Sequence, residues 1–181
     1  MCLPVKNVTI INNEWEDNEY PLAYLITIRT FGSWLHGDER GSVDRHGRNI
    51  YGTARIASDP KFTARMLANI PNPEFLLNGP QRSCVENSIR RVCSFRGYNL
   101  QAINVRTNHV HAVISAALKP ESIINAFKAN ATRELRENGL VNIEITVWSR
   151  GGSRRYLWKP NNVDAAIDYV VNGQGDDLPN F

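Results

Sequence analysis

The sequence predicts an α+β fold: a ferredoxin-like antiparallel sheet with helices mainly on one face. Two apolar segments with strand-like alternation are joined by a short polar turn, and segments with helical spacing precede and follow this hairpin. A hairpin flanked by helical connections is typical of that arrangement. We expect residues 1–181 to form a single domain, because the length and the 42% apolar content suit one core.

The N-terminal half predicts one strand, one long loop and one helix. Residues 24–31 are rich in β-branched side chains, with Leu25 and Thr27 on one side and Tyr24, Ile26 and Ile28 on the other. A glycine-, aspartate- and arginine-rich segment without periodicity begins at residue 32, so we expect a long loop over about 32–80. Residues 80–97 then predict a helix with apolar positions at Val85, Ile89, Val92 and Phe95.

The C-terminal half predicts the hairpin, two helices and a short extended region. The hairpin strands are expected over 98–105 and 109–117, with the break at Thr107 and Asn108. A helix over 120–138 directs inward Ile123, Ile124, Phe127, Ala131 and Leu135. Residues 145–158 predict two short extended pieces around a glycine turn. The last helix, in 162–176, has an apolar stripe of Val163, Ile167, Val170 and Val171 and ends at Gly173 and Gly175.

Composition narrows the possible partners and compartments. The net charge is +3, and only five of the 21 basic residues are lysine, so most positive charge is guanidinium, which suits phosphates and base edges. No segment has the eighteen or more uncharged apolar residues of a membrane span, and the first residues lack the layout of a signal peptide. We therefore expect a cytoplasmic protein without membrane contact.

Two histidines share one face of the second hairpin strand. In the segment TNHVHAVIS, His109 and His111 are two residues apart, so they point the same way, while Val110, Ala112 and Ile114 take the opposite face. Two neutral imidazoles can hold a divalent metal if a third ligand comes from elsewhere in the chain. The alternative is that the rings are hydrogen-bonded residues at the end of a hairpin.

The last helix contains a tyrosine outside its apolar stripe. Tyr169 projects sideways from the helix, and Asn172 lies one turn further along on the same side. A phenol is barely ionised at neutral pH, so it becomes a useful nucleophile only beside a cation or a base. Tyrosine on a helix is more often a packing residue.

The ordered combination of these segments resembles a known family. NHVHAVIS, followed about 60 residues later by a helical tyrosine in IDYVVNGQG, is similar to the single-tyrosine HUH transposases, which include IS200-like and REP-associated tyrosine transposases. Further similar segments are RTFGSWLHGDERG, NAFKANATRELRENG and WSRGGSRRYLW, so the resemblance extends over about residues 24–174.

The resemblance implies a DNA transposase that nicks and joins single-stranded or hairpin DNA. It implies that His109 and His111 bind Mg or Mn, that Tyr169 is the nucleophile forming a 5′-phosphotyrosine, and that the protein is a homodimer. The family commonly has a glutamine or asparagine one helical turn after the tyrosine as third ligand, but that position is Gly173 here. Gln174 is the favoured substitute because QG resembles the family, and Asn172, with the better helical phase, is the runner-up.

Basic and aromatic residues alternate before the last helix. Arg150, Arg154 and Arg155 stand among Trp148, Tyr156 and Trp158, a pattern that suits unpaired bases and phosphates; half-buried aromatics in a short strand are equally compatible. The last candidate DNA-binding residues are Lys128 and Arg133 on the 120–138 helix, and a second candidate metal cluster is His36, Asp38 and Glu39.

Two other functions compete with the transposase interpretation. A replication initiator or relaxase would normally need a larger chain. A non-catalytic single-stranded nucleic-acid-binding protein of the same fold, domesticated or decayed, is the stronger alternative, because Gly173 departs from the family pattern.

Overall fold

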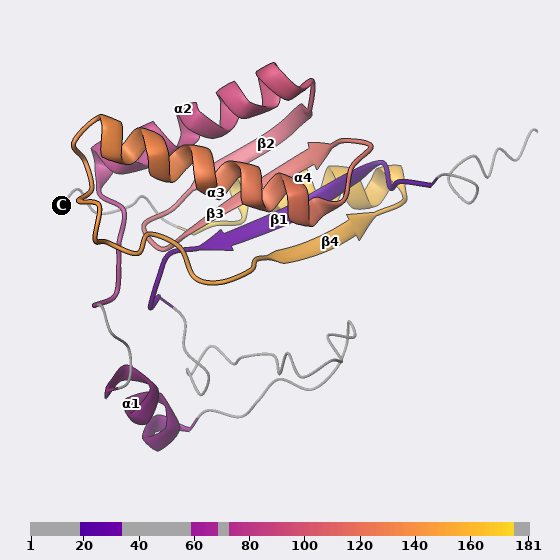
Figure 1. The fold of residues 1–181 in the computed structure, drawn as a ribbon. Helices are drawn as coiled ribbons and strands as arrows, with labels where there is room; N and C mark the ends of the chain where they lie inside the picture. Colours follow the sequence, from indigo (N-terminus) through magenta and orange to yellow (C-terminus); the bar gives the residue numbers. More distant parts are fainter. Residues whose placement is uncertain (1–18, 34–58, 69–72, 176–181) are drawn as a thin grey trace, which may run out of the picture.

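Four antiparallel strands form one sheet in the computed structural model, which describes residues 19–33, 59–68 and 73–175 (Figure 1). The strand order is β2-β3-β1-β4. The strands are β1 (Ala23–Arg29), β2 (Asn99–Val105), β3 (His109–Ser115) and β4 (Ser153–Leu157). The helices are α1 (Pro60–Ala68), α2 (Gly79–Arg96), α3 (Pro120–Glu137) and α4 (Pro160–Asn172).

The connections confirm the predicted ferredoxin-like α+β arrangement. β2 and β3 form the hairpin, α2 leads from β1 toward β2, and α3 leads from β3 to β4, so β1 and β3 occupy the centre of the sheet. Figure 1 shows α2 and α3 side by side over one face and α4 behind the other. None of the helices in the described part of the chain is apolar over a stretch long enough to cross a membrane.

Local sequence explains where the two long helices begin and end. The Asn78 side chain accepts from the backbone N–H of Gln81, and the Gln81 side chain accepts from the backbone N–H of Asn78, which forms a capping box before α2. Gly97 ends α2 in the left-handed region, with φ of 68°. α3 begins at Pro120, where a missing N–H is tolerated.

The sheet separates two hydrophobic clusters. The larger one lies between the sheet and α2 and α3, and it includes Val110, Ala112 and Ile114 from β3 and all five apolar residues predicted to face inward from α3. The smaller one lies beneath α4 and includes Val113, Leu157, Val163, Ala166 and Val170. The predicted alternation of β3 is therefore confirmed, and its histidine face is the one that α4 partly covers.

Four details of the sequence prediction are wrong. The long loop expected over 32–80 contains α1, a helix of nine residues that begins with proline. Phe95 is 91% exposed, because Cys93 takes the buried position in the last turn of α2. Val171 is also exposed, and Ala166 completes the stripe of α4. Only the second predicted extended piece of 145–158 is a strand, since Trp148 makes a single bridge to Thr30.

Candidate active site

The two histidines of β3 lie beside each other on the α4 face of the sheet. Their ring centroids are 4.5 Å apart, with the planes at 69°. His111 is buried, at 8% exposure, and its cross-strand neighbours are Thr27 on β1 and Asn104 on β2. His109 is half-buried nearer the hairpin turn, opposite Arg29. The site thus begins in the middle of the sheet and opens toward one end of it.

The Nδ1 atom of each ring has a partner from the same chain. Nδ1 of His111 lies 2.8 Å from the hydroxyl oxygen of Thr27. Nδ1 of His109 lies 2.6 Å from the side-chain oxygen of Asn108 in the hairpin turn. The Nε2 atoms are the remaining ring nitrogens, and they are the ones that can meet a ligand over the sheet.

Burial keeps His111 neutral. Desolvation, with smaller contributions from His109 and the Arg29 guanidinium, lowers the pKa of His111 to about 3. A neutral imidazole is the form that binds a metal, so His111 needs no deprotonation for that purpose at neutral or mildly acidic pH.

The same shift predicts a pH-dependent stability of the metal-free protein. His111 in the unfolded chain takes up a proton near its ordinary pKa of 6.5, whereas in the folded chain it does so only near 3. The unfolded state therefore binds more protons in this window, and stability falls as pH falls, by at most about 1.4 kcal/mol per pH unit from this group. Urea unfolding of wild type and His111→Gln should show a shallower decline in the variant between pH 6.5 and 4. Parallel pH profiles would contradict this effect.

Helix α4 positions Tyr169 over the histidines. Val163, Ala166 and Val170 anchor the helix on the sheet, and the side-chain amide of Asn104 donates to the carbonyl of Val170 at 3.0 Å. The ring of Tyr169 packs edge-on against His111, with centroids 5.4 Å apart, yet 44% of the residue is exposed. The phenol is thus held beside an imidazole of its own chain and stays open to solvent.

The chain turns sharply after α4 and brings Gln174 to the histidines. The side-chain oxygen of Gln174 lies 3.4 Å from Nε2 of His109, and its amide nitrogen donates to the carbonyl of Tyr169 at 2.8 Å. Asn172 is exposed and donates to the carboxylate of Asp168 at 2.7 Å. The geometry therefore favours Gln174 over Asn172 as a partner of the imidazole pair.

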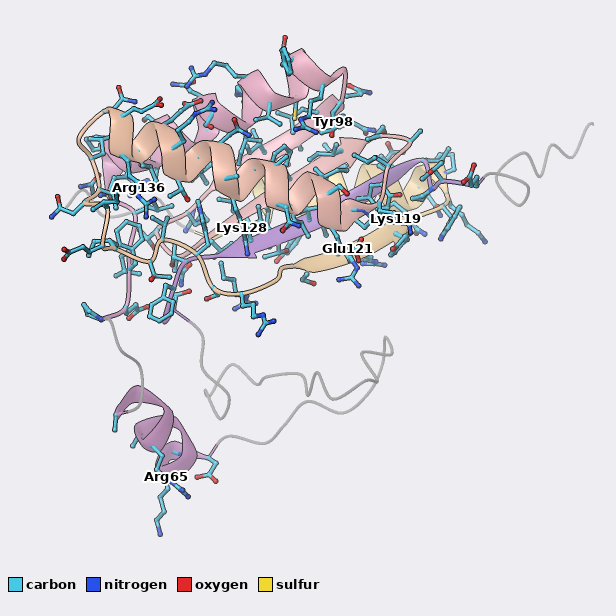
Figure 2. The ribbon with its side chains drawn as sticks, viewed as in Figure 1. Arg65, Tyr98, Lys119, Glu121, Lys128 and Arg136 are labelled. Atoms are coloured by element: carbon cyan, nitrogen blue, oxygen red, sulfur yellow. The ribbon has the colours of Figure 1, made fainter. Side chains whose placement is uncertain are left out.

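The basic residues singled out from the sequence are divided between two faces. Arg155 is opposite Leu25 in the sheet and so belongs to the histidine face, whereas Arg154 is opposite Ile26 and pairs with Glu121 at 2.9 Å on the α3 side. Figure 2 shows Lys128 on α3, on the sheet face away from α4. Its ammonium donates to the carbonyls of Ser149 and Gly151, and therefore holds the turn before β4.

The other basic residues of that set, and the aromatic residues near them, lie on α3, in the segment before β4, or at β4 and its end. Arg133 is an exposed residue of α3, and its guanidinium lies 3.8 Å from the carboxylate of Glu137. Arg150 is exposed in the turn before β4. Trp148 donates to the Thr132 hydroxyl and packs on the larger cluster. Tyr156 and Trp158 form an exposed parallel pair with centroids 6.4 Å apart.

Four neighbours of the histidines were not singled out from the sequence: Thr27, Arg29, Asn104 and Asn108. The alternation of residues 24–31 already places Thr27 and Arg29 on one face, but only the pairing of β1 with β3 puts that face beside the histidines. Asn108 was assigned only to the turn. His36, Asp38 and Glu39 lie outside the described residues, and the described ranges contain no cluster of three histidine, cysteine or acidic residues suited to a metal.

The donors around the imidazole pair fit a divalent cation. Ligands at right angles around a Mg²⁺-sized ion are about 3 Å apart, close to the 3.4 Å between His109 Nε2 and the Gln174 oxygen. Both Nδ1 atoms already have partners, so the donor set is two Nε2 atoms and one amide oxygen, all uncharged. An ion held this way keeps its full charge and leaves other coordination positions for water or phosphate.

The chain folds as a ferredoxin-like sheet that carries a histidine pair beside a solvent-accessible tyrosine. Residues 69–161, just over half of the 181-residue chain, match the family described as "Transposase IS200 like", and the chain belongs to this family. The matched segment contains both histidines and ends before Tyr169 and Gln174.

The solved structures to which the chain is similar include "Structure of the REP associates tyrosine transposase bound to a REP hairpin". The identity is 12%, the TM-score is 0.46, and the similarity covers 83% of this chain and 65% of that one. The chain thus spans about two thirds of the length of that protein. No curated protein matches the chain.

Proposed function

We propose that this protein is a metal-dependent tyrosine transposase that nicks and rejoins single-stranded DNA. The observation that supports this most is the convergence of three groups on one face of the sheet. The Tyr169 ring centroid is 5.4 Å from that of His111, and the amide oxygen of Gln174 is 3.4 Å from His109 Nε2. A solvent-exposed tyrosine and three uncharged side chains that could donate to a cation thus lie together on one face of the sheet.

Tyr169 is the nucleophile in this proposal. Its phenolic oxygen attacks a backbone phosphorus and loses its proton, the new oxygen–phosphorus bond forms, and the bond from phosphorus to the 3′ oxygen breaks. The departing 3′ oxygen takes up a proton and becomes a free 3′-OH. The product is a 5′-phosphotyrosine, and attack by a 3′-OH reverses the reaction without ATP because a phenolate leaves more readily than an alkoxide.

His109, His111 and Gln174 would hold the Mg or Mn ion. When bound, such an ion supplies positive charge that polarises the phosphate oxygens and stabilises the phenolate. The chain's own residues prepare for this, since burial keeps His111 neutral and the amide nitrogen of Gln174 fixes its side chain against the end of α4.

Arg155 and Arg29 are two arginines on the site face, and we propose that they guide the DNA backbone. Arg29 lies opposite His109, and Arg155 lies two residues from Ser153, which is opposite Thr27. Guanidinium groups there would neutralise phosphates flanking the scissile one. DNA contacts by Arg150, Arg154, Lys128 and Arg133 stay predictions, as do the hairpin substrate, the homodimer and the cytoplasmic location.

A covalent-adduct assay tests the proposed function. The full chain would be incubated with Mn²⁺ and a panel of single-stranded and hairpin oligonucleotides labelled at the 3′ end. Because the 5′-phosphate side stays on the protein, we expect label on the protein after denaturation, and none in the presence of EDTA. Binding of these oligonucleotides with no adduct would favour the non-catalytic alternative.

Gln174 and Asn172 give a prediction for metal binding. Gln174→Ala removes the amide oxygen beside His109, and we expect Mn²⁺ to bind roughly tenfold more weakly. Asn172→Ala is the matched control, because the Asn172 side chain is exposed and donates to the carboxylate of Asp168. Isothermal titration calorimetry would measure both affinities. Weaker binding in the Asn172 variant alone would assign the third ligand to that residue.

A further inference from the structure

The two imidazoles of the site are each fixed at the nitrogen that faces away from the ligand side. Asn108 meets Nδ1 of His109 at 2.6 Å through its amide oxygen, and Thr27 meets Nδ1 of His111 at 2.8 Å through its hydroxyl. An amide oxygen can only accept a hydrogen bond, so the short Asn108 contact favours a proton on Nδ1 of His109, whereas the Gln174 oxygen lies farther from Nε2, at 3.4 Å. A hydroxyl can accept or donate, so the Thr27 contact admits either tautomer of His111.

The sheet register explains why Thr27 reaches this nitrogen. Thr27 and His111 are directly opposite in the β1–β3 pairing, and cross-strand neighbours on the same face have their Cβ atoms within about 5.5 Å. The Thr27 hydroxyl is one bond from its Cβ, and Nδ1 is the ring nitrogen nearer to the Cβ of His111, so the two groups can meet between the strands. A longer polar side chain at 27 would extend past the ring.

The tautomer decides whether His111 can bind a cation. A neutral imidazole has one N–H and one lone pair, and a ring protonated at Nε2 presents hydrogen, not a lone pair, to the site. His111 is at 8% exposure, so solvent gives little help in selecting the tautomer. Its selection therefore falls to the partner at Nδ1.

We propose that Thr27 and Asn108 are positioning residues that hold His111 and His109 as Nδ1–H tautomers, with both Nε2 lone pairs directed to one cation together with the Gln174 oxygen. This inference rests on the proposed function, because it specifies how the metal site of that function is prepared. In this arrangement the Thr27 hydroxyl accepts from His111. Partners of this kind commonly set the orientation and basicity of metal-bound histidines.

A purely structural role for Thr27 makes different predictions. If the hydroxyl only satisfied a buried ring nitrogen, its loss would lower stability and leave the affinity for metal unchanged. Thr27→Val keeps the β-branched shape that suits a strand and removes the acceptor. Thr27→Ser keeps the acceptor and removes a methyl group, so it should restore the site while losing packing.

The tautomers can be measured without metal or activity. In protein labelled with ¹⁵N-histidine, long-range ¹H–¹⁵N spectra distinguish a protonated ring nitrogen from one with a lone pair. We expect both site histidines of metal-free wild type to be protonated at Nδ1. In Thr27→Val, His111 should shift toward the Nε2–H form, and Mn²⁺ should bind about tenfold more weakly in calorimetry.

A second threonine provides the matched control. The hydroxyl of Thr132 accepts from Trp148 on the other side of the sheet, at 3.1 Å, so Thr132→Val also removes a hydroxyl hydrogen bond. This variant should retain the wild-type tautomers and Mn²⁺ affinity. Thr27→Ser should do the same, and Asn108→Asp, which keeps an accepting oxygen, should keep His109 in the Nδ1–H form.

The possible failures are distinguishable. A wild-type His111 protonated at Nε2, or equal Mn²⁺ affinities of wild type and Thr27→Val, would overturn this inference while leaving the proposed function in place. Failure of wild type to bind Mn²⁺ would overturn the proposed metal site and this inference with it. Loss of affinity in Thr132→Val equal to that in Thr27→Val would also overturn it, because the effect would then be general destabilisation.

Discussion

Replacing Tyr169 by phenylalanine should abolish the covalent protein–DNA adduct and lower strand cleavage by at least about a thousandfold. The substitution removes only the attacking oxygen and keeps the ring that packs edge-on against His111. Because Tyr169 is 44% exposed, stability should change by less than about 0.5 kcal/mol. Mn²⁺ affinity should also be unchanged, since the phenol is not among the proposed ligands. Adduct formation, calorimetry and thermal unfolding would measure the three effects.

Tyr156→Phe is the matched control for this experiment. Tyr156 has the same exposure of 44%, but it lies on β4 opposite Tyr24 and so belongs to the other face of the sheet. Its phenol is therefore remote from the imidazole pair. Adduct formation by the Tyr156 variant should equal that of wild type. Persistence of the adduct in Tyr169→Phe would remove this residue from the nucleophile role.

The face shared by the histidines could be predicted from the sequence because it depends only on local geometry. Alternation along a strand has a period of two, so the segment 109–115 assigns His109 and His111 to one side without knowledge of any other element. The same argument separates Arg154 from Arg155, which are adjacent on β4 and lie on opposite faces. Treating Arg154 and Arg155 as one DNA-binding group because both are basic does not take these opposite faces into account.

The neighbours of the histidines required information that the sequence does not contain locally. Thr27 and Arg29 are about 80 positions before the histidines, and their proximity depends on the register between β1 and β3. A shift of one residue in that register would turn Thr27 away from His111. The same holds for Asn104, whose contact with the Val170 carbonyl depends on where α4 crosses the sheet.

Helical phase alone does not predict that Gln174, rather than Asn172, lies beside His109. Asn172 has the better phase if α4 continues regularly, and the structure indeed includes it as the last helical residue, where it pairs with Asp168. Gly173 then ends the helix, and the chain turns so that Gln174 approaches His109. Helix ends are set by capping, which the spacing of apolar residues does not report.

Gly173 leads to the second prediction with a large effect. The Gly173→Gln variant adds an amide at the position that the family resemblance would favour and keeps Gln174. We expect it to lower adduct formation by about 10- to 100-fold. A Cβ at 173 would lie 2.8 Å from the carbonyl oxygen of Tyr169 and 3.0 Å from Cδ2 of its ring. Something must move, and the nearest groups are the backbone and ring of the proposed nucleophile.

Two further variants separate the added Cβ from the added amide. Gly173→Ala should have nearly the same effect as Gly173→Gln, because the close contact comes from Cβ. Gly79→Ala, where the nearest atom to an added Cβ is 3.9 Å away at the end of a flexible arginine, should be silent in the adduct assay. If Gly173→Gln instead matched or exceeded wild type while Gly173→Ala was impaired, an amide at 173 would be an effective ligand. Gly173 would then be a change that weakens the site. Impairment of both variants would instead mean that the glycine makes room for the Tyr169 side chain and leaves the ligand role to Gln174.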